Sequence, residues 1–317
     1  MVVEPDDVKI RVCYATVGHE EMRVRSSGNR YSKEGIIGLE MSGVIVDLGR
    51  QAQIQGFTVG DVVTGHPLQY CQACRACRSG RENCCSNLTI NTGTMCEFMV
   101  WKSNQLVKVS PKLSMREASL IPSVAEALEA IERGKVGILS RVAIWGGNYM
   151  SLILCQLIQK LGVRETAVID DVPQREPMER RMGASHVLHP QDPDFELKLH
   201  RLTEFAGFDT IFECSGLSGT LNQSIEYLSR GGTVVLMTCY EKPVAMSMDA
   251  SVFYLGNYTV TSVLNFARKM DAAEQAARSL RLQELISQEY PLESAPEAFQ
   301  RYDVKQHYKI AIRIGQA

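Results

Sequence analysis

Short runs of alternating or β-branched apolar residues fill the first 120 residues of the chain. Gly, Pro and Asn separate these runs, and runs of this kind predict strands rather than helices. The expected strands cover residues 8–12, 42–49, 61–65, 97–101 and 106–109. Over 115–134 the apolar residues recur at helical spacing instead, with Pro122 as an interruption. The pattern therefore predicts a β-rich first body followed by a helix.

From residue 140 onward, expected strands and helices alternate. The strands lie at 141–145, 166–170, 187–189, 209–216 and 231–237, and the helices at 149–162 and near 174–182, 194–206 and 218–229. Such alternation is typical of an α/β fold, a doubly wound parallel sheet with helices on both faces. A helix near 270–281 and a last strand at 308–314 suit a return of the chain to the first body.

Composition narrows the class of protein. The chain has 317 residues, 45% of them hydrophobic and 22% charged, and a net charge of −2 with acids and bases mixed along it. That mixture predicts no nucleic-acid partner and no membrane partner, and it leaves a small molecule as the expected ligand. The start, MVVEPDDVKI, lacks the features of a signal peptide, and the longest apolar stretch, 149–158, is too short to span a bilayer. A cytoplasmic location is the resulting expectation.

Four cysteines stand close together in the pattern C-x2-C-x2-C-x7-C: Cys71, Cys74, Cys77 and Cys85. Tetrahedral zinc takes four thiolates at about 2.3 Å, and such short gaps let one loop surround the ion. Four thiolates leave no open position, so we expect one structural zinc per chain. Disulfides are the alternative, but the other cysteines are scattered singly, which suits a reducing compartment. The spacing favours Cys85 over its neighbour Cys84.

The segment after strand 141–145 is a weakened dinucleotide fingerprint. In G-x-G-x-x-G the three glycines form the turn, admit the pyrophosphate and allow close helix packing. Here the positions hold Gly146, Asn148 and Ser151, and the helix that follows would still attract an anion. Asp170 ends the next strand, 24 residues after Gly146, where a carboxylate binds ribose hydroxyls and favours NAD(H). Arg175 leaves room for NADP(H), and a sheet that has lost its dinucleotide is the alternative.

The whole arrangement resembles the zinc-containing medium-chain dehydrogenase/reductase superfamily, above all its alcohol, polyol and threonine dehydrogenases. The resemblance rests on the cysteine loop and on GLEMSGVIVDLG (38–49), FTVGDVV (57–63), LIPSVAEALEA (120–130), FECSG (212–216), GGTVVLM (231–237) and YPLESAPEAF (290–299). It implies a GroES-like β-rich domain at 1–121 and 266–317, with a zinc lobe at about 68–90. It also implies a Rossmann domain at 122–265 and assembly as a homodimer or homotetramer.

The resemblance also implies which residues hold the cofactor. They lie in the turn after strand 141–145, at and after the end of strand 166–170, and near the end of strand 209–216. The residues are Gly146, Gly147, Asn148, Tyr149, Met150, Asp170, Asp171, Arg175, Cys214 and Ser215.

The catalytic zinc of the family has no matching ligands in this sequence. Its ligand positions fall on Thr16, Leu39 and either Pro122 or Ser123. Glu40 of the same motif is kept, and Gly18 stands where the family often carries a proton-relaying hydroxyl. Neither leucine nor proline can ligate zinc through its side chain. Alcohol oxidation polarised by a metal ion is therefore not expected.

Other side chains could take part in a rearranged site. A metal site built from Cys13, His19 and Glu40 is one alternative, and a packing role for His19 is the other. The same two interpretations apply to His66, which follows the G-D-x-V turn. The candidate catalytic residues are Thr16, Tyr14, His19 and Glu40, the first three as proton donors to a substrate.

Three functions remain open. The first is an NAD(H)-dependent oxidoreductase without catalytic zinc that acts on an activated acceptor, such as a conjugated alkene, an iminium or an electron-poor carbonyl. The second is a non-catalytic relative, a partner subunit or nucleotide-binding sensor. The third is an ordinary zinc-dependent alcohol or polyol dehydrogenase, which the missing ligands disfavour.

Overall fold

The computed structural model describes residues 3–26, 35–163, 165–238, 240, 244–264, 267–303 and 305–315. Contacts divide the chain into two compact units, one of residues 1–125 and 264–317 and the other of residues 126–263. The expected boundary between residues 265 and 266 lies outside the described residues. Every helix in the described ranges is too short or too polar to cross a lipid bilayer.

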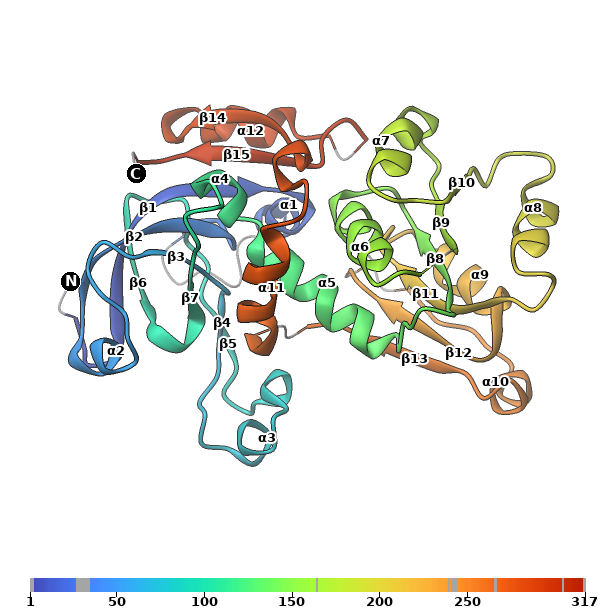
Figure 1. The fold of residues 1–317 in the computed structure, drawn as a ribbon, viewed down its shortest axis with the longest axis horizontal. Helices are drawn as coiled ribbons and strands as arrows, with labels where there is room; N and C mark the ends of the chain where they lie inside the picture. Colours follow the sequence, from blue (N-terminus) through green and yellow to red (C-terminus); the bar gives the residue numbers. More distant parts are fainter. Residues whose placement is uncertain are drawn as a thin grey trace. The chain divides into compact units, whose positions relative to one another are not determined.

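The first unit is built on a mixed sheet (Figure 1). Its strands run in the order β14-β15-β1-β2-β3-β7, and β6 also pairs with β1. Their bounds are β1 (Asp7–Val17), β2 (Met41–Leu48), β3 (Val62–Gly65), β6 (Phe98–Lys102), β7 (Leu106–Lys108), β14 (Ile286–Pro291) and β15 (Lys309–Arg313). The carboxy-terminal strands therefore complete the sheet that the amino-terminal strands begin.

Helices surround this sheet, namely α1 (His19–Ser26), α2 (Arg50–Ile54), α4 (Met115–Ala118), α11 (Met270–Ala277) and α12 (Ala295–Arg301). The expected helix at 115–134 is two helices, α4 and α5 (Ile121–Arg133). Pro122 does not break α5, because it lies in the first turn, where its missing N–H would have no helical partner. The helix expected near 270–281 ends earlier, at Ala277.

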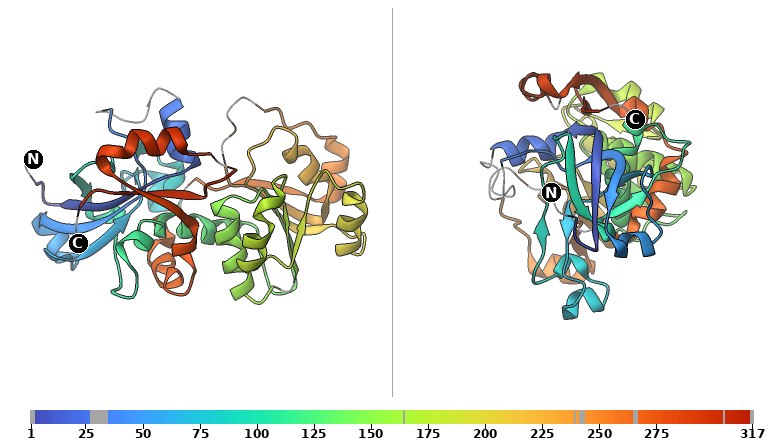
Figure 2. Two further views of the ribbon diagram at one scale, coloured as in Figure 1. Left: turned by 90° about the horizontal axis from the view of Figure 1, so that it is seen from above. Right: turned by 90° about the vertical axis from the view of Figure 1, so that its left-hand side faces the viewer.

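A small lobe projects from the sheet of this unit in the views of Figures 1 and 2. It consists of β4 (Leu68–Gln69), α3 (Arg75–Arg78), the short helix η1 (Glu82–Cys84) and β5 (Thr89–Ile90). Arg268 ties it to the carboxy-terminal part of the unit, since its Nε and Nη2 both donate to Glu82 Oε1, at 2.9 and 2.7 Å.

The second unit is a parallel sheet with the strand order β10-β9-β8-β11-β12-β13. Its strands are β8 (Arg141–Trp145), β9 (Glu165–Ile169), β10 (His186–Leu188), β11 (Phe208–Glu213), β12 (Leu228–Leu236) and β13 (Thr259–Ser262). Its helices are α6 (Tyr149–Lys160), α7 (Glu176–Arg181), α8 (Phe195–Leu202), α9 (Thr220–Glu226) and α10 (Ala250–Gly256). The strand order reverses between β8 and β11, and right-handed crossovers then put helices on both faces.

Two expected helices of this unit are several residues too long at the end, since α8 stops at Leu202 rather than near 206 and α9 is also shorter. The sequence predicts a helix near 218–229, but α9 stops at Glu226. Leu228 already pairs with Phe208 of the neighbouring strand, so sheet pairing prevails over helical spacing at these residues.

Candidate functional site

The four predicted cysteine ligands meet in the lobe of the first unit. Their sulfur atoms all lie within 4.8 Å of one another. The Cys74–Cys77, Cys71–Cys85, Cys74–Cys85 and Cys71–Cys77 distances are 3.5, 3.6, 3.9 and 4.0 Å. A tetrahedral ion with zinc–sulfur bonds of about 2.3 Å needs sulfur atoms about 3.8 Å apart, so the cage has the right size for zinc.

The surroundings of the sulfur atoms suit thiolates that share a cation. Backbone N–H groups point at them, Cys74 N at Cys71 Sγ (3.3 Å) and Cys71 N at Cys85 Sγ (3.4 Å). Hydrogen bonds from the backbone of Cys77 and Ser86 lower the pKa of Cys74 to about 6. Burial raises the pKa of Cys77 to about 12, and a shared metal ion would stabilise all four thiolates together. Cys84 is exposed and not among the four.

A second cluster, centred on Glu40, lies where β1 ends and where β2 and β15 begin. Thr16 Oγ1 donates to Glu40 Oε2 at 2.5 Å, and Ser123 Oγ donates to Glu40 Oε1. Lys309 Nζ lies 2.8 Å from the same Oε2. The carboxylate therefore has two hydroxyl donors and one ammonium around it.

Strand pairing explains why these residues meet. β1 pairs with β2 through Ala15 and Met41, so Thr16 and Glu40 fall next to each other at the ends of the two strands. β1 also pairs with β15 through Val17 and Ile310, which brings Lys309 alongside. The ammonium thus reaches the carboxylate from the opposite side of β1.

The Lys309 side chain runs past Gly18, close to its Cα. A Cβ at Gly18 would lie 2.7 Å from Nζ and 2.9 Å from both Cδ and Cε. Because 3.0 Å is closer than real side-chain carbons come, the glycine is needed for the lysine to take this path. The place where a hydroxyl was expected from the resemblance is therefore filled by a lysine stem.

Glu21 completes the cluster from the first turn of α1. Its Oε2 accepts the Gly18 N–H at 2.8 Å and lies 3.6 Å from Lys309 Nζ, while its Oε1 has no hydrogen-bond partner among the described residues. Burial raises the pKa of Glu21 to about 7 against the opposing effect of Lys309, and the charge of Glu40 adds to the rise. Burial alone would lower the pKa of Lys309, but the glutamates raise it, so it stays an ammonium.

The other two predicted catalytic residues, Tyr14 and His19, lie on β1 and at the start of α1. Tyr14 lies on β1, where burial raises its pKa and its charged neighbours are Glu289, Arg313 and Arg116. His19 opens α1. Cys13, His19 and Glu40 do not form a metal-binding group, since among the described residues the four cysteines are the only such group of three or more. His66 is buried beside Tyr70, and burial lowers its pKa to about 4.

In the second unit the predicted cofactor residues gather at the carboxyl ends of β8, β9 and β11. Gly146 has φ of +88°, and an added Cβ would lie 2.9 Å from Ser215 Cα, so the tight turn requires glycine. Asn148 Nδ2 donates to Cys214 O at 2.7 Å. Tyr149 and Met150 begin α6 and are buried, while Asp171 is exposed. This is the point where the strand order reverses, the usual ligand position in such sheets.

The helix that follows the turn is capped by its own chain. Asn148 Oδ1 accepts the N–H groups of Met150 (3.0 Å) and Ser151 (3.2 Å). Ser151 Oγ donates to Gly146 O. Two donors that a pyrophosphate would use at this helix end are thus already satisfied. The shape of the turn is compatible with a dinucleotide. The N–H groups of Met150 and Ser151 can bind its phosphates only after they leave Asn148 Oδ1.

Asp170 follows β9 and is 2% exposed. Arg175 Nη1 lies 3.4 Å from its Oδ2. The carboxylate is thus where a ribose-binding acid was expected, but it is already engaged by an arginine.

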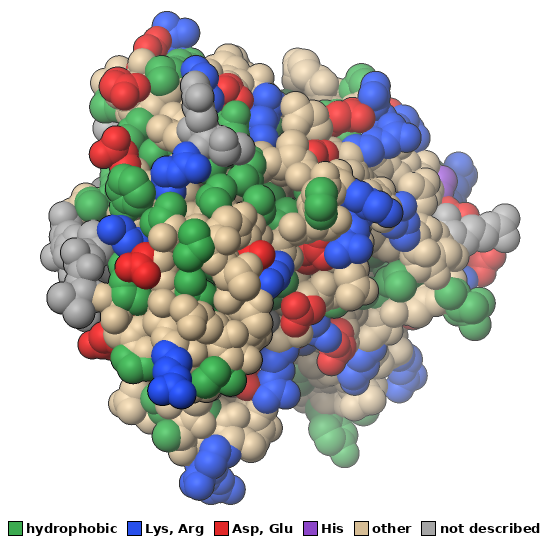
Figure 3. Space-filling view, turned by 60° about the vertical axis from the view of Figure 1, so that its left-hand side comes forward, with side chains coloured by type: hydrophobic (Ala, Val, Ile, Leu, Met, Phe, Trp, Pro, Cys, Tyr) green, Lys and Arg blue, Asp and Glu red, His purple; other side chains and the backbone are tan. Residues whose placement is uncertain are grey.

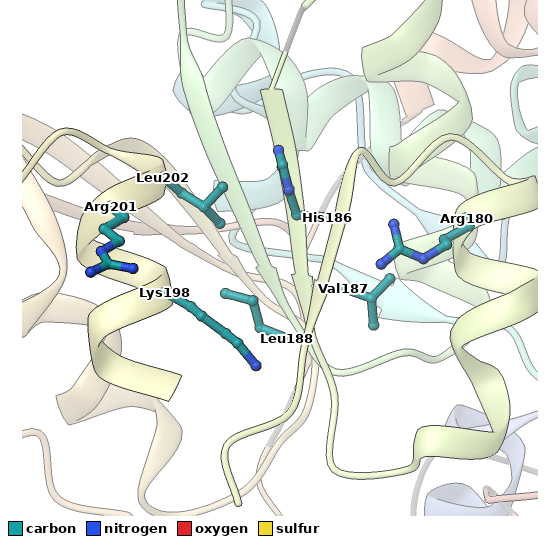
Figure 4. Close-up of a pocket in the computed structure, with 7 residues that line it drawn as sticks. All are labelled: Arg180, His186, Val187, Leu188, Lys198, Arg201 and Leu202. Atoms are coloured by element: carbon teal, nitrogen blue, oxygen red, sulfur yellow. The ribbon is translucent and has the colours of Figure 1, made fainter. Parts of the chain in front are cut away.

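The pocket drawn in Figure 4 lies elsewhere in this unit, beside the edge strand β10. Arg180 of α7 lies on one side and Lys198 and Arg201 of α8 on the other. Arg180 pairs with Glu176 at 2.8 Å, Lys198 with Asp194 at 2.9 Å and His186 with Glu165 at 2.6 Å. Most of its positive charge is therefore neutralised by the chain itself. Lys and Arg also lie among Asp and Glu on the molecular face of Figure 3.

Lys309, Glu21 and Glu179 are among the buried charged residues that sequence reasoning missed. Lys309 stands at the start of the apolar strand YKIAIRI, and a charge in such a run is a signal of a buried ion pair. Glu21 and Glu179 lie in the polar runs HEE and MERR, which are indistinguishable from solvent-exposed helix faces.

Comparison with known proteins agrees with this geometry. Residues 4–111 match the family model "Alcohol dehydrogenase GroES-like domain", and residues 150–280 match "Zinc-binding dehydrogenase". The chain is 24% identical over 310 residues to a 2-dehydro-3-deoxy-L-galactonate 5-dehydrogenase of Pseudoalteromonas atlantica, covering 94% of this chain and 88% of that protein.

Solved structures share the fold. Alcohol dehydrogenase TADH from Thermus sp. ATN1 superimposes with a TM-score of 0.89 at 22% identity, covering 99% of this chain and 93% of that one. A Sinorhizobium meliloti protein solved with bound NADP gives 0.87 at 21% identity, covering 99% and 93%. The fold, the cysteine cage and the two family models together show that this chain belongs to the zinc-containing medium-chain dehydrogenase/reductase superfamily and is an oxidoreductase of that type.

Proposed function

We propose that this oxidoreductase transfers hydride between NAD(H) and a small organic substrate, with one structural zinc and no catalytic zinc. One observation carries the proposal: the carboxylate of Glu40 is saturated by Thr16, Ser123 and Lys309. Thr16 and Ser123 occupy two positions where the resemblance implies metal ligands, and both hydroxyls are used as donors to Glu40.

The charge of the cluster supports the same conclusion. A divalent cation at this place would stand within a few ångströms of the Lys309 ammonium, and like charges at such distances repel strongly in a buried site. The ammonium already neutralises Glu40, so a metal ion would have to displace it. Two further carboxyl groups face Lys309 Nζ, Glu20 at 4.0 Å and Glu21 at 3.6 Å, and burial raises the pKa of Glu21 to about 7.

Without a metal ion to polarise an oxygen, the substrate must be activated already. A conjugated alkene, an iminium or an electron-poor carbonyl meets that condition, and the protein then contributes mainly positioning. Tyr14, His19 and Thr16 are the proposed proton donors, and Thr16 can donate to a substrate only after it releases its hydrogen bond to Glu40. We further propose that the chain assembles as a homodimer or homotetramer, as the family resemblance implies.

The cofactor is proposed to bind at the Gly146 turn, with Asp170 toward the adenosine ribose. A nicotinamide dinucleotide would supply or accept the hydride. The acidic side chain favours NAD(H), since a 2′-phosphate would face like charge. Arg175 is engaged with Asp170, which leaves it less suited to a 2′-phosphate.

A second function is favoured by one specific observation. Asn148 satisfies two N–H groups of α6 that a pyrophosphate would otherwise bind. A chain that caps this helix itself has less use for a dinucleotide, as expected of a non-catalytic partner subunit.

One experiment distinguishes the two proposed functions. NADH is titrated by fluorescence into the purified protein, and deuteride transfer from NADH labelled at C4 is followed by mass spectrometry with a panel of enals, nitroalkenes and cyclic iminium ions. Binding in the micromolar range and label in a reduced product support the oxidoreductase. Absence of binding and of label transfer supports the non-catalytic alternative and contradicts the proposal.

A further inference from the structure

Glu179 lies on the inner side of α7, with none of its surface exposed. A Cβ placed on Gly147 would lie 2.0 Å from Glu179 Oε1 and 2.5 Å from Asp170 Oδ2. Both carboxyl groups therefore lie close to the same glycine, in the turn between β8 and α6. A Cβ at position 147 would force both carboxyl groups to shift from these positions.

No N–H or O–H donor among the described residues reaches either oxygen of Glu179. Asp170 is the carboxyl group beside it, since Glu179 Oε1 and Asp170 Oδ2 would lie 2.0 and 2.5 Å from the same added Cβ on Gly147. The other charged or titratable groups facing it are Arg175, Glu176 and the buried thiol of Cys155. The nearest cation, Arg175, pairs with Asp170.

Two carboxylates cannot lie together in a buried place without a large electrostatic cost, and one shared proton removes it. The O–H of a protonated Glu179 would then donate to Asp170, whose other charged neighbour is the Arg175 guanidinium. Burial and the charge of Asp170 agree with this assignment, since they raise the pKa of Glu179 to about 8.

We propose that Glu179 is a specificity-determining residue of the cofactor turn. The proton that Glu179 shares with Asp170 keeps a second negative charge away from the dinucleotide. Loss of this proton weakens binding of NADP(H) more than binding of NAD(H). This inference rests on the proposed function, because it names the regulation and selectivity of the same site.

The direction of the effect follows from charge. A dinucleotide brings its pyrophosphate to this turn, and NADP(H) brings a further phosphate to the ribose end. Once Glu179 is deprotonated, each phosphate faces one more unit of like charge. This repulsion weakens binding, and the tenfold rise in Kd expected from it corresponds to about 1.4 kcal/mol.

The test is a titration of NADH and NADPH by fluorescence from pH 6.5 to 9.5. For the wild type we expect the Kd for NADH to rise about tenfold over this range, and the Kd for NADPH to rise further. Glu179→Gln, which keeps the size and stays neutral, should bind both with little pH dependence. Glu176→Gln is the matched control on the same helix, and it should behave as the wild type because the pKa of Glu176 is lowered by its hydrogen bond from Arg180.

A measurement without cofactor separates this inference from the proposed function. The free energy of unfolding of the wild type, minus that of Glu179→Gln, should fall as pH rises from 4.5 to about 8 and level off above that, because the pKa of Glu179 is raised from 4.5 to about 8 in the folded state. Equal slopes for the two proteins would show that no proton is shared, which overturns the inference whatever the cofactor does. Equal pH dependence of Kd in the wild type and Glu179→Gln would overturn it too. A normal stability difference with no dinucleotide binding by either protein would contradict the proposed function, and the selectivity role would fall with it.

Discussion

Lys309 Nζ lies 2.8 Å from Glu40 Oε2, and the two residues are only 1% and 7% exposed. They are 269 positions apart in the sequence, and strand β1 stands between the strand ends that carry them. Lys309 therefore supplies a buried positive charge at the place where the resemblance implies the catalytic zinc.

Removing that charge should be costly. Lys309→Met leaves Glu40 buried with hydroxyl donors but no cation, and breaking a buried pair costs about 3–5 kcal/mol. Urea unfolding should show a loss of this size. Lys305→Met, an exposed lysine four residues away, should change little. If Lys309→Met is as stable as Lys305→Met, the ion pair is not what neutralises Glu40. The double variant Lys309→Met/Glu40→Gln should regain part of the loss, since it leaves no bare carboxylate at position 40.

Glu21 should make the stability of the protein depend on pH. Its folded-state pKa is raised to about 7 by burial, from a value of 4.5 for a free glutamate. Its contribution is therefore fully present below pH 4.5 and is lost as pH rises through 7. The unfolding free energy of the wild type, minus that of Glu21→Gln, should fall by on the order of 1–3 kcal/mol between pH 4.5 and 8. Glu20→Gln, at the more exposed neighbour, should lack this effect, and a flat difference for Glu21→Gln would contradict the assignment.

Gly18 and Lys309 should be coupled in stability. Gly18→Ala places a methyl group 2.7–2.9 Å from the end of the lysine side chain. Overpacking of this kind costs about 1–3 kcal/mol. In the Lys309→Met background the cost should shrink, because the longer, charged end is gone, and a double-mutant cycle measures the difference. Additive losses would show that the two residues do not compete for the same space.

Cys74→Ser should remove one ligand from the cage and release zinc. Structural zinc contributes folding free energy directly, so we expect a large drop in melting temperature and a loss of metal by atomic absorption. Cys84→Ser is the control, since this exposed cysteine next to Cys85 lies outside the cage. Retention of one zinc and an unchanged melting temperature in Cys74→Ser would contradict the four-cysteine assignment.

The lobe and the second sheet were accessible to sequence reasoning for clear reasons. Cysteines at short, regular gaps have few uses besides metal, and the structure places Cys71, Cys74, Cys77 and Cys85 together as predicted. The strand–helix alternation after residue 140 reflects the period-2 and period-3.6 patterns of a buried parallel sheet. Both signals are local, so one chain is enough to show them.

The Glu40 cluster could be predicted only in part. The resemblance pointed to Thr16, Glu40 and Ser123, but not to Lys309 or Glu21. Lys309 reaches the cluster through the pairing of β15 with β1, and Glu21 reaches it from the first turn of α1. Neither contact can be recognised from the spacing of apolar residues in the sequence. Glu179 escaped for a related reason: a glutamate on an amphipathic helix is normally exposed, and only its contact with Gly147 shows otherwise.

The most direct test of the account is a count of metal ions per chain. The protein is purified, incubated with excess zinc or cobalt, freed of unbound metal by gel filtration and measured by inductively coupled plasma mass spectrometry. We predict one ion per wild-type chain, none in Cys74→Ser, and an unchanged single ion in Glu40→Gln. Two ions per wild-type chain, with the second lost in Glu40→Gln, would show that Lys309 does not take the place of a metal and would contradict the central claim.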